Sequence, residues 1–263
     1  MAEIICLANS YKNQGRCIAG ISLRTGQWIR PISDLDDGRI PLNHSHIPVS
    51  SINLLDVIEV PLDQECQHGH ECENYRYHHH PWCIVRQASI TEVLRYRENR
   101  LLHSSFKKAI PFSYFQENAP IKSLQLIKVK EFECRQNSYY KWRGLIHDQR
   151  YGLENIEFSI TDPFILEKLN NDETVSSHCL LTLSFGQPWR ASEDEDWKCY
   201  RLIAGIIELP PKLDSILVEM ERLGWQENDG RRYLQQKFDK QSRYQLTEEE
   251  CQEFLDHLEK LSQ

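Results

Sequence analysis

The chain has 263 residues, a length that suits two small domains with an appended segment. Its formal net charge is −8 at pH 7, so the overall field does not attract polyanions, and any contact with nucleic acid requires a local basic groove. No apolar run approaches the roughly 18 residues of a membrane span, and the first residues lack the pattern of a secretory signal, so we expect neither feature.

The N-terminal segment predicts three short strands connected by tight turns. Residues 4–7 and 16–23 are apolar, and the polar residues 12–15 between them carry a glycine. Residues 24–27 have the composition of a hairpin turn, after which Trp28 opens the next strand. Three such strands are typical of the beginning of a small antiparallel barrel or sandwich.

The following residues alternate between short strands, loops and two helices. A loop is predicted over residues 33–51, and an irregular stretch over residues 64–81. Ser89 opens a helix because it forms a capping box with Glu92, and either Thr161 or Asp162 caps a second, short helix. The further predicted strands cover residues 54–61, 123–132, 141–146, 156–161, 179–185 and 198–209.

This order of elements divides into two strand-rich units, residues 1–120 and residues 121–209. Each unit has about five short strands and one helix, a combination that is typical of small OB-type barrels. We therefore predict a mainly β fold with two OB-like small barrels in tandem, the first of which carries an inserted helix.

A C-terminal module of three helices is predicted over residues 210–263, where Pro210 and Pro211 mark its boundary. The expected helices run from 214 to 223, from a cap at Asn228 or Asp229 to Phe238, and from a cap at Thr247 to Leu261. So small a module cannot bury a large core of its own. We expect it to dock on the barrels or on a partner protein.

The candidate partner-binding residues of this module are aromatic: Trp225, Tyr233 and Phe254. Aromatic side chains are frequent anchors of protein interfaces. The alternative for Trp225 is a place in the core, where it would close the three helices.

The cysteines indicate a reducing compartment. The chain has nine, an odd number, and they are scattered along it. Cys6, Cys17, Cys179 and Cys199 lie in apolar, strand-like runs, as buried thiols do. We therefore expect a cytoplasmic protein.

A nucleic-acid interface is the first candidate site. OB barrels bind single strands by stacking bases on aromatic rings while cations follow the backbone. The residues with this chemistry are Lys12, Arg16, Trp28, Arg30, Tyr75, Arg76, Tyr139, Tyr140, Lys141, Trp142 and Arg143. The helical stretch with Arg95, Arg97 and Arg100 could extend the basic track. The alternative, which the acidic net charge favours, is that the strand aromatics are core residues and the arginines are solvated.

A zinc site is the second candidate, because cysteine and histidine concentrate within residues 66–83. Thiolates and imidazoles at this density can bind zinc in tetrahedral geometry. The candidate ligands are Cys66, His68, His70, Cys72 and Cys83. The paired spacing of common zinc motifs is missing. The alternative is a histidine-rich loop that hydrogen bonds from His70, Glu73 and Asn74 hold in place.

Catalysis has little support in the sequence. We find no nucleophile motif and no glycine-rich phosphate loop, so we predict no catalytic residues and no cofactor other than the possible structural zinc. A zinc-dependent hydrolase that uses His70, Glu73, Asp56 and Glu59 is the third alternative.

Several segments resemble the dual-OB-domain proteins of bacterial defence and mobile-element gene neighbourhoods. The matching segments are residues 6–10, 15–20, 28–31, 55–61, 70, 73–74, 184–186 and 199–207. The resemblance implies two OB domains and a nucleic-acid or nucleotide theme, without a reaction. In the tail, residues 223–225, 230–234, 243 and 246–259 resemble a short helical module that is appended to assorted proteins of photosynthetic bacteria, including single-strand annealing recombinases. This second resemblance implies a docking or DNA-related context.

The function that we expect is therefore a non-enzymatic nucleic-acid-binding protein acting in bacterial defence or a mobile element. It would hold single-stranded DNA or RNA, or a guide–target complex, and its tail would recruit a protein partner without membrane contact. The alternative is a protein-interaction adaptor or scaffold that contacts an effector subunit and no nucleic acid.

Overall fold

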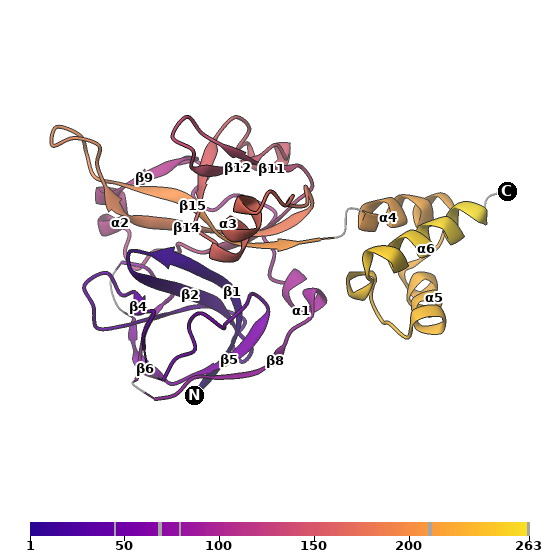
Figure 1. Ribbon diagram of the computed structural model, residues 1–263, viewed down its shortest axis with the longest axis horizontal. Coiled ribbons are helices and arrows are strands. Elements are labelled where there is room, and N and C mark those ends of the chain that lie inside the picture. Colours follow the sequence, from indigo (N-terminus) through magenta and orange to yellow (C-terminus); the bar gives the residue numbers. More distant parts are fainter. Residues whose placement is uncertain (45, 68–69, 79, 210–211, 262–263) are drawn as a thin grey trace.

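The computed structural model describes residues 1–44, 46–67, 70–78, 80–209 and 212–261, and for residues 63–67 it describes the backbone alone. The predicted mainly β fold is confirmed: two sheets lie one above the other, and a group of helices packs beside them (Figure 1). A helix with the length and hydrophobicity needed to cross a bilayer is absent from the described residues.

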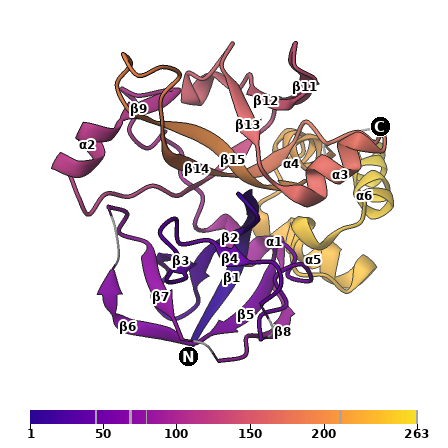
Figure 2. The same ribbon diagram turned by 60° about the vertical axis from the view of Figure 1, so that its left-hand side comes forward.

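The first sheet is built from the N-terminal third of the chain and forms the lower layer in Figure 2. Its strands are β1 (Ala2–Lys12), β2 (Gly15–Ser22), β3 (Trp28–Ile32), β4 (Ile40–Pro41), β5 (Asp56–Val60), β6 (Leu62–Gln67), β7 (Asn74–Tyr77) and β8 (Cys83–Gln87). They pair in the order β6-β7-β3-β2-β1-β5-β8, and β4 pairs with the start of β2. The register of β1 against β2 shifts between Cys6 and Ala8, so Leu7 lies at a bulge.

The sequence predicted irregular structure over residues 64–81, and that prediction is wrong for residues 64–67 and 74–77, which belong to β6 and β7. β7 pairs in parallel with β3, where Asn74 lies opposite Arg30, and β6 pairs with β7. The partner of a parallel strand comes from a distant segment. The composition of residues 64–81, which is rich in histidine and cysteine, therefore could not predict the pairing with β3, because the partner strand lies elsewhere in the sequence.

The second sheet is the upper layer in both views. Its strands are β9 (Ala109–Pro111), β10 (Gln125–Val129), β11 (Phe132–Gln136), β12 (Trp142–Ile146), β13 (Glu157–Ile160), β14 (Cys179–Trp189) and β15 (Lys198–Glu208). They pair in the order β10-β14-β15-β13-β12-β11, and β9 pairs with β15. Because β9 joins this sheet, the second unit takes in residues that precede the expected boundary at residue 121.

Short helices connect the strands where local caps allow them to begin. They are α1 (Ile90–Leu94), α2 (Phe112–Glu117), the 3₁₀ turn η1 (Gln149–Tyr151) and α3 (Pro163–Asn170). The capping box of Ser89 with Glu92 is confirmed, and of the two candidate caps of α3 it is Asp162 that accepts the N–H groups of its first turn. Helix α1 is shorter than its apolar pattern, which continues to Leu101, because the N–H of Glu98 bonds instead to the carbonyl of Leu126 in β10 at 2.7 Å.

The three C-terminal helices of the predicted module are present. They are α4 (Lys212–Arg222), α5 (Glu227–Phe238) and α6 (Glu248–Lys260), with the 3₁₀ turn η2 (Arg243–Gln245) between the last two. The capping box of Thr247 with Glu250 is confirmed. The predicted cap of α5 needs correction: the helix begins at Glu227, since the carboxylate of Asp229 accepts the N–H of Gln226 at 2.9 Å from inside the first turn.

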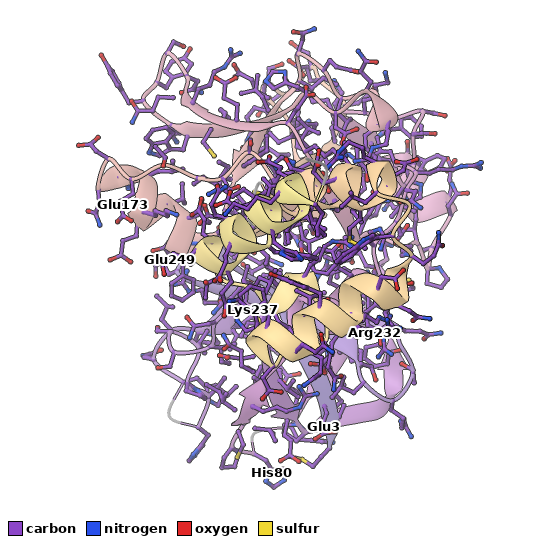
Figure 3. The ribbon with its side chains drawn as sticks, turned by 90° about the vertical axis from the view of Figure 1, so that its right-hand side faces the viewer. Glu3, His80, Glu173, Arg232, Lys237 and Glu249 are labelled. Atoms are coloured by element: carbon purple, nitrogen blue, oxygen red, sulfur yellow. The ribbon has the colours of Figure 1, made fainter. Side chains whose placement is uncertain are left out.

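The helical module, residues 212–261, docks on the two sheets of its own chain. One hydrophobic cluster includes Leu7 of β1 and Leu126 of β10 together with Ile216 of α4 and Phe254 of α6. Asp214 adds ion pairs with Lys128 and Lys130 at 3.3 and 3.0 Å, and the imidazole of His178 lies 3.4 Å from its carboxylate. Figure 3 views the outer face of the module, where Arg232, Lys237 and Glu249 are exposed.

Candidate nucleic-acid interface

The turn between β11 and β12 holds two tyrosine rings in solvent. Tyr139 is 78% exposed and Tyr140 is 84% exposed. The side-chain oxygen of Asn137 accepts the N–H groups of Tyr139 and Lys141, both at 3.0 Å, and its carbonyl accepts the N–H of Tyr140 at 2.9 Å. Tyr140 has a left-handed backbone with φ of 57°. The two rings therefore stand on a hydrogen-bonded turn, which we call the hairpin tip (residues 137–141).

The other predicted residues of this hairpin flank the tip. Lys141 is exposed, and Arg143 is half-buried on β12 with its guanidinium donating to the carbonyl of Trp142 at 3.3 Å. The indole N–H of Trp142 donates to Asn170 at the end of α3 at 2.8 Å, and the ring packs against the core of the second sheet. Two exposed tyrosine rings and an exposed lysine thus lie together, beside a tryptophan that its hydrogen bond to Asn170 holds in place.

Three further predicted residues are enclosed by the fold. Trp28 belongs to the hydrophobic core, and Arg16 and Arg30 are buried. A buried side chain presents no surface to a nucleic-acid strand. Their placement favours the alternative interpretation, in which the strand aromatics and some arginines are structural.

Arg30 connects the two sheets instead of facing solvent. Its terminal nitrogens donate to Asn74 at 3.1 Å, to Ser123 at 2.9 Å and to Ser184 at 3.2 Å. Glu71 lies 3.7 Å away as the ionic partner. Asn74 belongs to the first sheet, whereas Ser184 belongs to the second, so the guanidinium ties one sheet to the other.

The remaining predicted residues lie on the first sheet, apart from the hairpin. Lys12 is half-buried at the end of β1. Tyr75 packs against the core of the first sheet, and Arg76 forms a 2.8 Å ion pair with Asp34. The hairpin tip belongs to the other sheet, so the structure does not join these residues to it through a shared strand.

The proposed zinc ligands are only partly described. The side chains of Cys66 and His68 lie outside the described residues. Cys83 is exposed on the edge strand β8, whereas Cys72 precedes β7 near the opposite edge of the sheet. Burial raises the pKa of the Cys72 thiol to about 11, which disfavours the thiolate. Within the described residues, no cluster of three or more His, Cys, Asp or Glu could hold a metal.

Hydrogen bonds hold the neighbouring segment in place, as the alternative interpretation expected. The buried carboxylate of Glu73 accepts the N–H groups of Ser123 and Leu124 at 2.6 and 2.9 Å. The carbonyl of His70 accepts the N–H of Ile121 at 2.7 Å. The imidazole ring of His70 lies edge-on to the ring of Phe112. A zinc site that includes Cys66 and His68 stays a prediction, which elemental analysis of the purified protein tests.

The aromatic residues of the helical module form one cluster. The ring of Tyr233 stacks on Phe254 at 4.8 Å between centroids and on His257 at 4.3 Å. Trp225 lies 6.3 Å from Tyr233 and 6.5 Å from Phe254. Phe254 is fully buried, while Trp225 and Tyr233 are half-buried. Phe254 is therefore a core residue, whereas the partly exposed rings of Trp225 and Tyr233 could contact a partner protein.

Sequence reasoning missed three arginines of the tail, Arg231, Arg232 and Arg243. The fold brings them to a cleft that Arg95 and Arg97 also line, whereas Arg100 is exposed outside it. Their sequence signal was the pair Arg231–Arg232 on an exposed helix face. Nothing local connected it with α1, more than a hundred residues away.

Comparison with known proteins identifies the domain that contains both sheets. A family model described as a dual OB-containing domain matches residues 2–206, the part of the chain from β1 into β15. No curated protein matches the chain, and no solved structure does. The matched segment spans well over half of the chain and most of both sheets, and the chain therefore belongs to the dual OB-containing domain family.

Proposed function

We propose that the protein binds single-stranded nucleic acid without catalysing a reaction, and that the hairpin tip stacks the bases. OB domains commonly bind nucleic acid. The observation that carries the proposal is the exposure of Tyr139 and Tyr140, 78% and 84%, on a hydrogen-bonded turn of an OB domain. Lys141 and Arg143 flank the rings and supply cations for the phosphates.

The energetics of this surface suit an acidic protein. Stacking of a base on an aromatic ring contributes roughly 1–3 kcal/mol and does not depend on net charge. The turn around Asn137 already holds the backbone of both tyrosines, so less conformational entropy is lost on binding. A protein with a net charge of −8 can bind nucleic acid only through a local site, and two rings with two nearby cations would provide one.

The test measures binding of fluorescent thymidine and uridine oligonucleotides of about 20 residues by anisotropy. We expect the double variant Tyr139→Ala/Tyr140→Ala to bind at least about tenfold more weakly than the wild type. Trp189→Ala is the matched control, because Trp189 is also an exposed aromatic of the second sheet, at 54%. Equal affinity of the folded tyrosine variant and the wild type would overturn the proposal.

An adaptor is the second candidate, supported by the extended hairpin of β14 and β15. Trp189 and Trp197 are exposed there, and the guanidinium of Arg190 lies 4.7 Å from the ring centre of Trp197. Residues 193–196 at its tip are all acidic, so this arm repels phosphates and suits a basic protein surface. Nucleic-acid binding weakens steeply with salt, whereas an adaptor of this kind shows no oligonucleotide binding at any salt concentration.

The biological setting is part of the same proposal. The segments quoted from both OB domains and from the tail support a cytoplasmic role in bacterial defence or a mobile element. In this setting, the half-buried rings of Trp225 and Tyr233 would recruit a protein partner through the helical module. Co-purification of a partner with the wild type, and its loss with Trp225→Ala, tests this part.

A further inference from the structure

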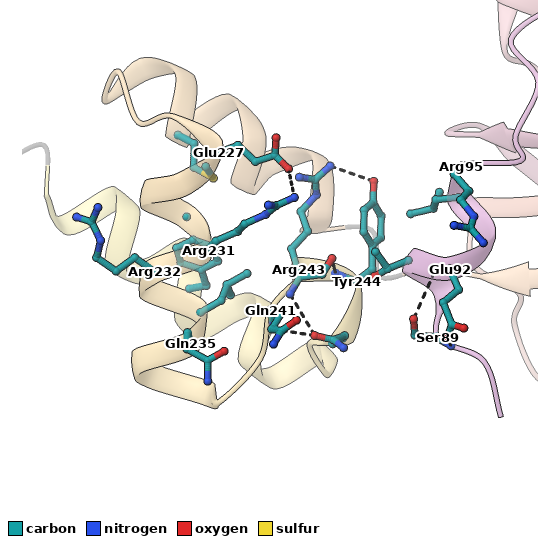
Figure 4. A pocket seen from close by; sticks show the side chains of 18 of the residues that line it. Ser89, Glu92, Arg95, Glu227, Arg231, Arg232, Gln235, Gln241, Arg243 and Tyr244 are labelled. Atoms are coloured by element: carbon teal, nitrogen blue, oxygen red, sulfur yellow. Dashed lines mark hydrogen bonds and ion pairs between the residues drawn. The ribbon is translucent and has the colours of Figure 1, made fainter. Parts of the chain in front are cut away.

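A cleft of about 940 Å³ lies between α1 and the helical module, which touch beside it (Figure 4). One wall comes from α1 and the residues that follow it, and the other from α5, η2 and their connection. Both walls are rich in arginine: the lining residues include Arg95, Arg97, Arg231, Arg232 and Arg243, against Glu92 and Glu227 as carboxylates. We call this feature the arginine cleft.

Both carboxylates of the arginine cleft are already neutralised. Glu92 receives two hydrogen bonds from Arg86, at 3.2 and 2.8 Å, and these bonds lower its pKa. Glu227 pairs with Arg231 at 2.6 Å. Neither carboxylate is therefore available to compensate the remaining cations of the lining.

Among the described residues, three guanidinium groups of the cleft have only neutral hydrogen-bond partners. Arg95 donates to its neighbour Tyr96 at 2.7 Å, Arg97 to the carbonyl of Leu94 at 3.1 Å, and Arg243 to the hydroxyl of Tyr244 at 3.0 Å. Within the part of the chain that the structure describes, no ion pair joins any of the three to a carboxylate.

Besides the arginines without carboxylate partners, the described part of the module wall has a buried donor without an acceptor, which also indicates a ligand site. The Nε of Arg243 is buried and has no hydrogen-bond partner among the described residues. A buried donor without a partner is costly, and an acceptor entering the cleft would relieve that cost. Arg231 and Arg243 also point toward one another beside Glu227, although their charges repel (Figure 4).

We propose that the arginine cleft binds the phosphate groups of a nucleotide or of a nucleic-acid strand. Guanidinium groups bind phosphate oxygens in pairs and keep their charge at every physiological pH. The volume lies in the range of small-ligand sites, which is about 300–1,000 Å³. A ligand whose phosphates contact arginines of both walls would fasten the helical module to α1.

This inference stands on the cleft alone and does not require the hairpin tip. The shared ligand chemistry is phosphate, and two sources can present it: a free nucleotide or the backbone of a strand. The probes are therefore ATP and pyrophosphate, measured by calorimetry, and a thymidine oligonucleotide of about 20 residues with a 5′-phosphate, measured by anisotropy.

Each wall has its own variant. Arg95→Gln/Arg97→Gln removes the arginine charges of the α1 wall, and Arg243→Gln removes the module-wall arginine that pairs with no carboxylate among the described residues. Arg24→Gln is the matched control, because Arg24 is exposed in the turn between β2 and β3 and does not line the cleft. Circular dichroism and thermal unfolding check that every variant is folded.

We expect each wall variant to weaken phosphate binding about tenfold or more, and the control to bind like the wild type. Weaker binding of ATP and pyrophosphate identifies a nucleotide site, and an effect on the oligonucleotide alone identifies a strand. Absence of binding by the wild type, or equal affinity of the folded wall variants, would refute the inference. The variant Tyr139→Ala/Tyr140→Ala keeps the cleft intact, so failure of the hairpin proposal is measured separately.

Discussion

The hydroxyl of Thr182 in β14 donates a 2.6 Å hydrogen bond to the carbonyl oxygen of Leu7 in β1, and both residues are buried. Leu7 lies where the register of β1 shifts, and the register of β14 also shifts next to Thr182. A bulge removes a residue from the ladder of its own sheet and leaves its backbone groups free. These two irregularities therefore join the two sheets.

A side chain at Gly205 should separate the sheets at this contact. A Cβ atom on Gly205 would lie 2.3 Å from the carbonyl oxygen of Leu7, a backbone atom that cannot move aside. We expect Gly205→Val to lower the free energy of unfolding by about 3 kcal/mol or more, measured by urea denaturation. Gly186→Ala is the control, because its Cβ would lie 3.3 Å from the flexible end of Leu202 and at an ordinary 3.6 Å from the carbonyl oxygen of Tyr200. Similar unfolding midpoints for the two variants would contradict this account.

Arg201 should be a stability residue despite its charge. Its guanidinium is buried and donates to the carbonyls of Lys107, Leu102 and Phe106 at 3.0, 2.8 and 3.2 Å. Burial lowers its pKa to about 10. Replacement by methionine leaves these carbonyls without their donor, so we expect a loss of about 3 kcal/mol in urea denaturation.

Arg201→Lys should not restore the lost stability, because one ammonium group cannot reproduce the arrangement of N–H donors on the planar guanidinium of arginine. The control is Arg135→Met, which breaks an exposed ion pair with Glu157 and should cost less than about 1 kcal/mol. If Arg201→Met lowered the free energy of unfolding as little as this control, the three hydrogen bonds to carbonyls would not stabilise the fold as proposed.

Asp162 should make stability depend on pH. Burial raises its pKa from 3.8 to about 6, although the N–H groups of Ile206, Ile165 and Phe164 stabilise the carboxylate. The protonated form therefore stabilises the fold below pH 3.8, and this contribution is lost as the pH rises through about 6. A shift of about two pH units corresponds to roughly 3 kcal/mol.

The measurement compares the wild type with Asp162→Asn, which is neutral at every pH, by urea denaturation between about pH 4 and pH 7. We expect the stability of the wild type to fall relative to the variant as the pH rises. Comparison with Asp148→Asn should give the opposite pH dependence. Partial burial raises the pKa of Asp148, but hydrogen bonds from Arg150 lower it overall, so the wild type should lose stability relative to this variant as the pH falls. Parallel pH profiles for wild type and Asp162→Asn would refute the prediction.

Asp214 should hold the helical module against the sheets. Although burial raises its pKa, Lys130 and Lys128 together lower it, so the carboxylate is charged at neutral pH. Asp214→Asn removes its ion pairs with both lysines, and we expect faster proteolysis of the module and a loss of about 1–2 kcal/mol. The control Glu253→Gln breaks only the exposed pair with Lys237. Unchanged proteolysis of Asp214→Asn would show that apolar contacts suffice.

Local features of the sequence determined the elements that depend on neighbouring residues. The capping boxes of Ser89 with Glu92 and of Thr247 with Glu250 were predictable, because each joins residues three positions apart. The alternation of short apolar strands and turns likewise predicted two strand-rich units. The hairpin tip was predictable as a candidate because its aromatic and basic residues are consecutive.

Tertiary structure alone decided which charged and aromatic side chains face solvent. Arg30 and Arg143 look alike in the sequence, yet Arg30 is 5% exposed and lies between the sheets because β3 pairs with β7. Arg95 and Arg243 line one cleft only because the helical module docks beside α1. Side-chain burial depends on contacts between distant segments, whereas composition and periodicity report only the local backbone.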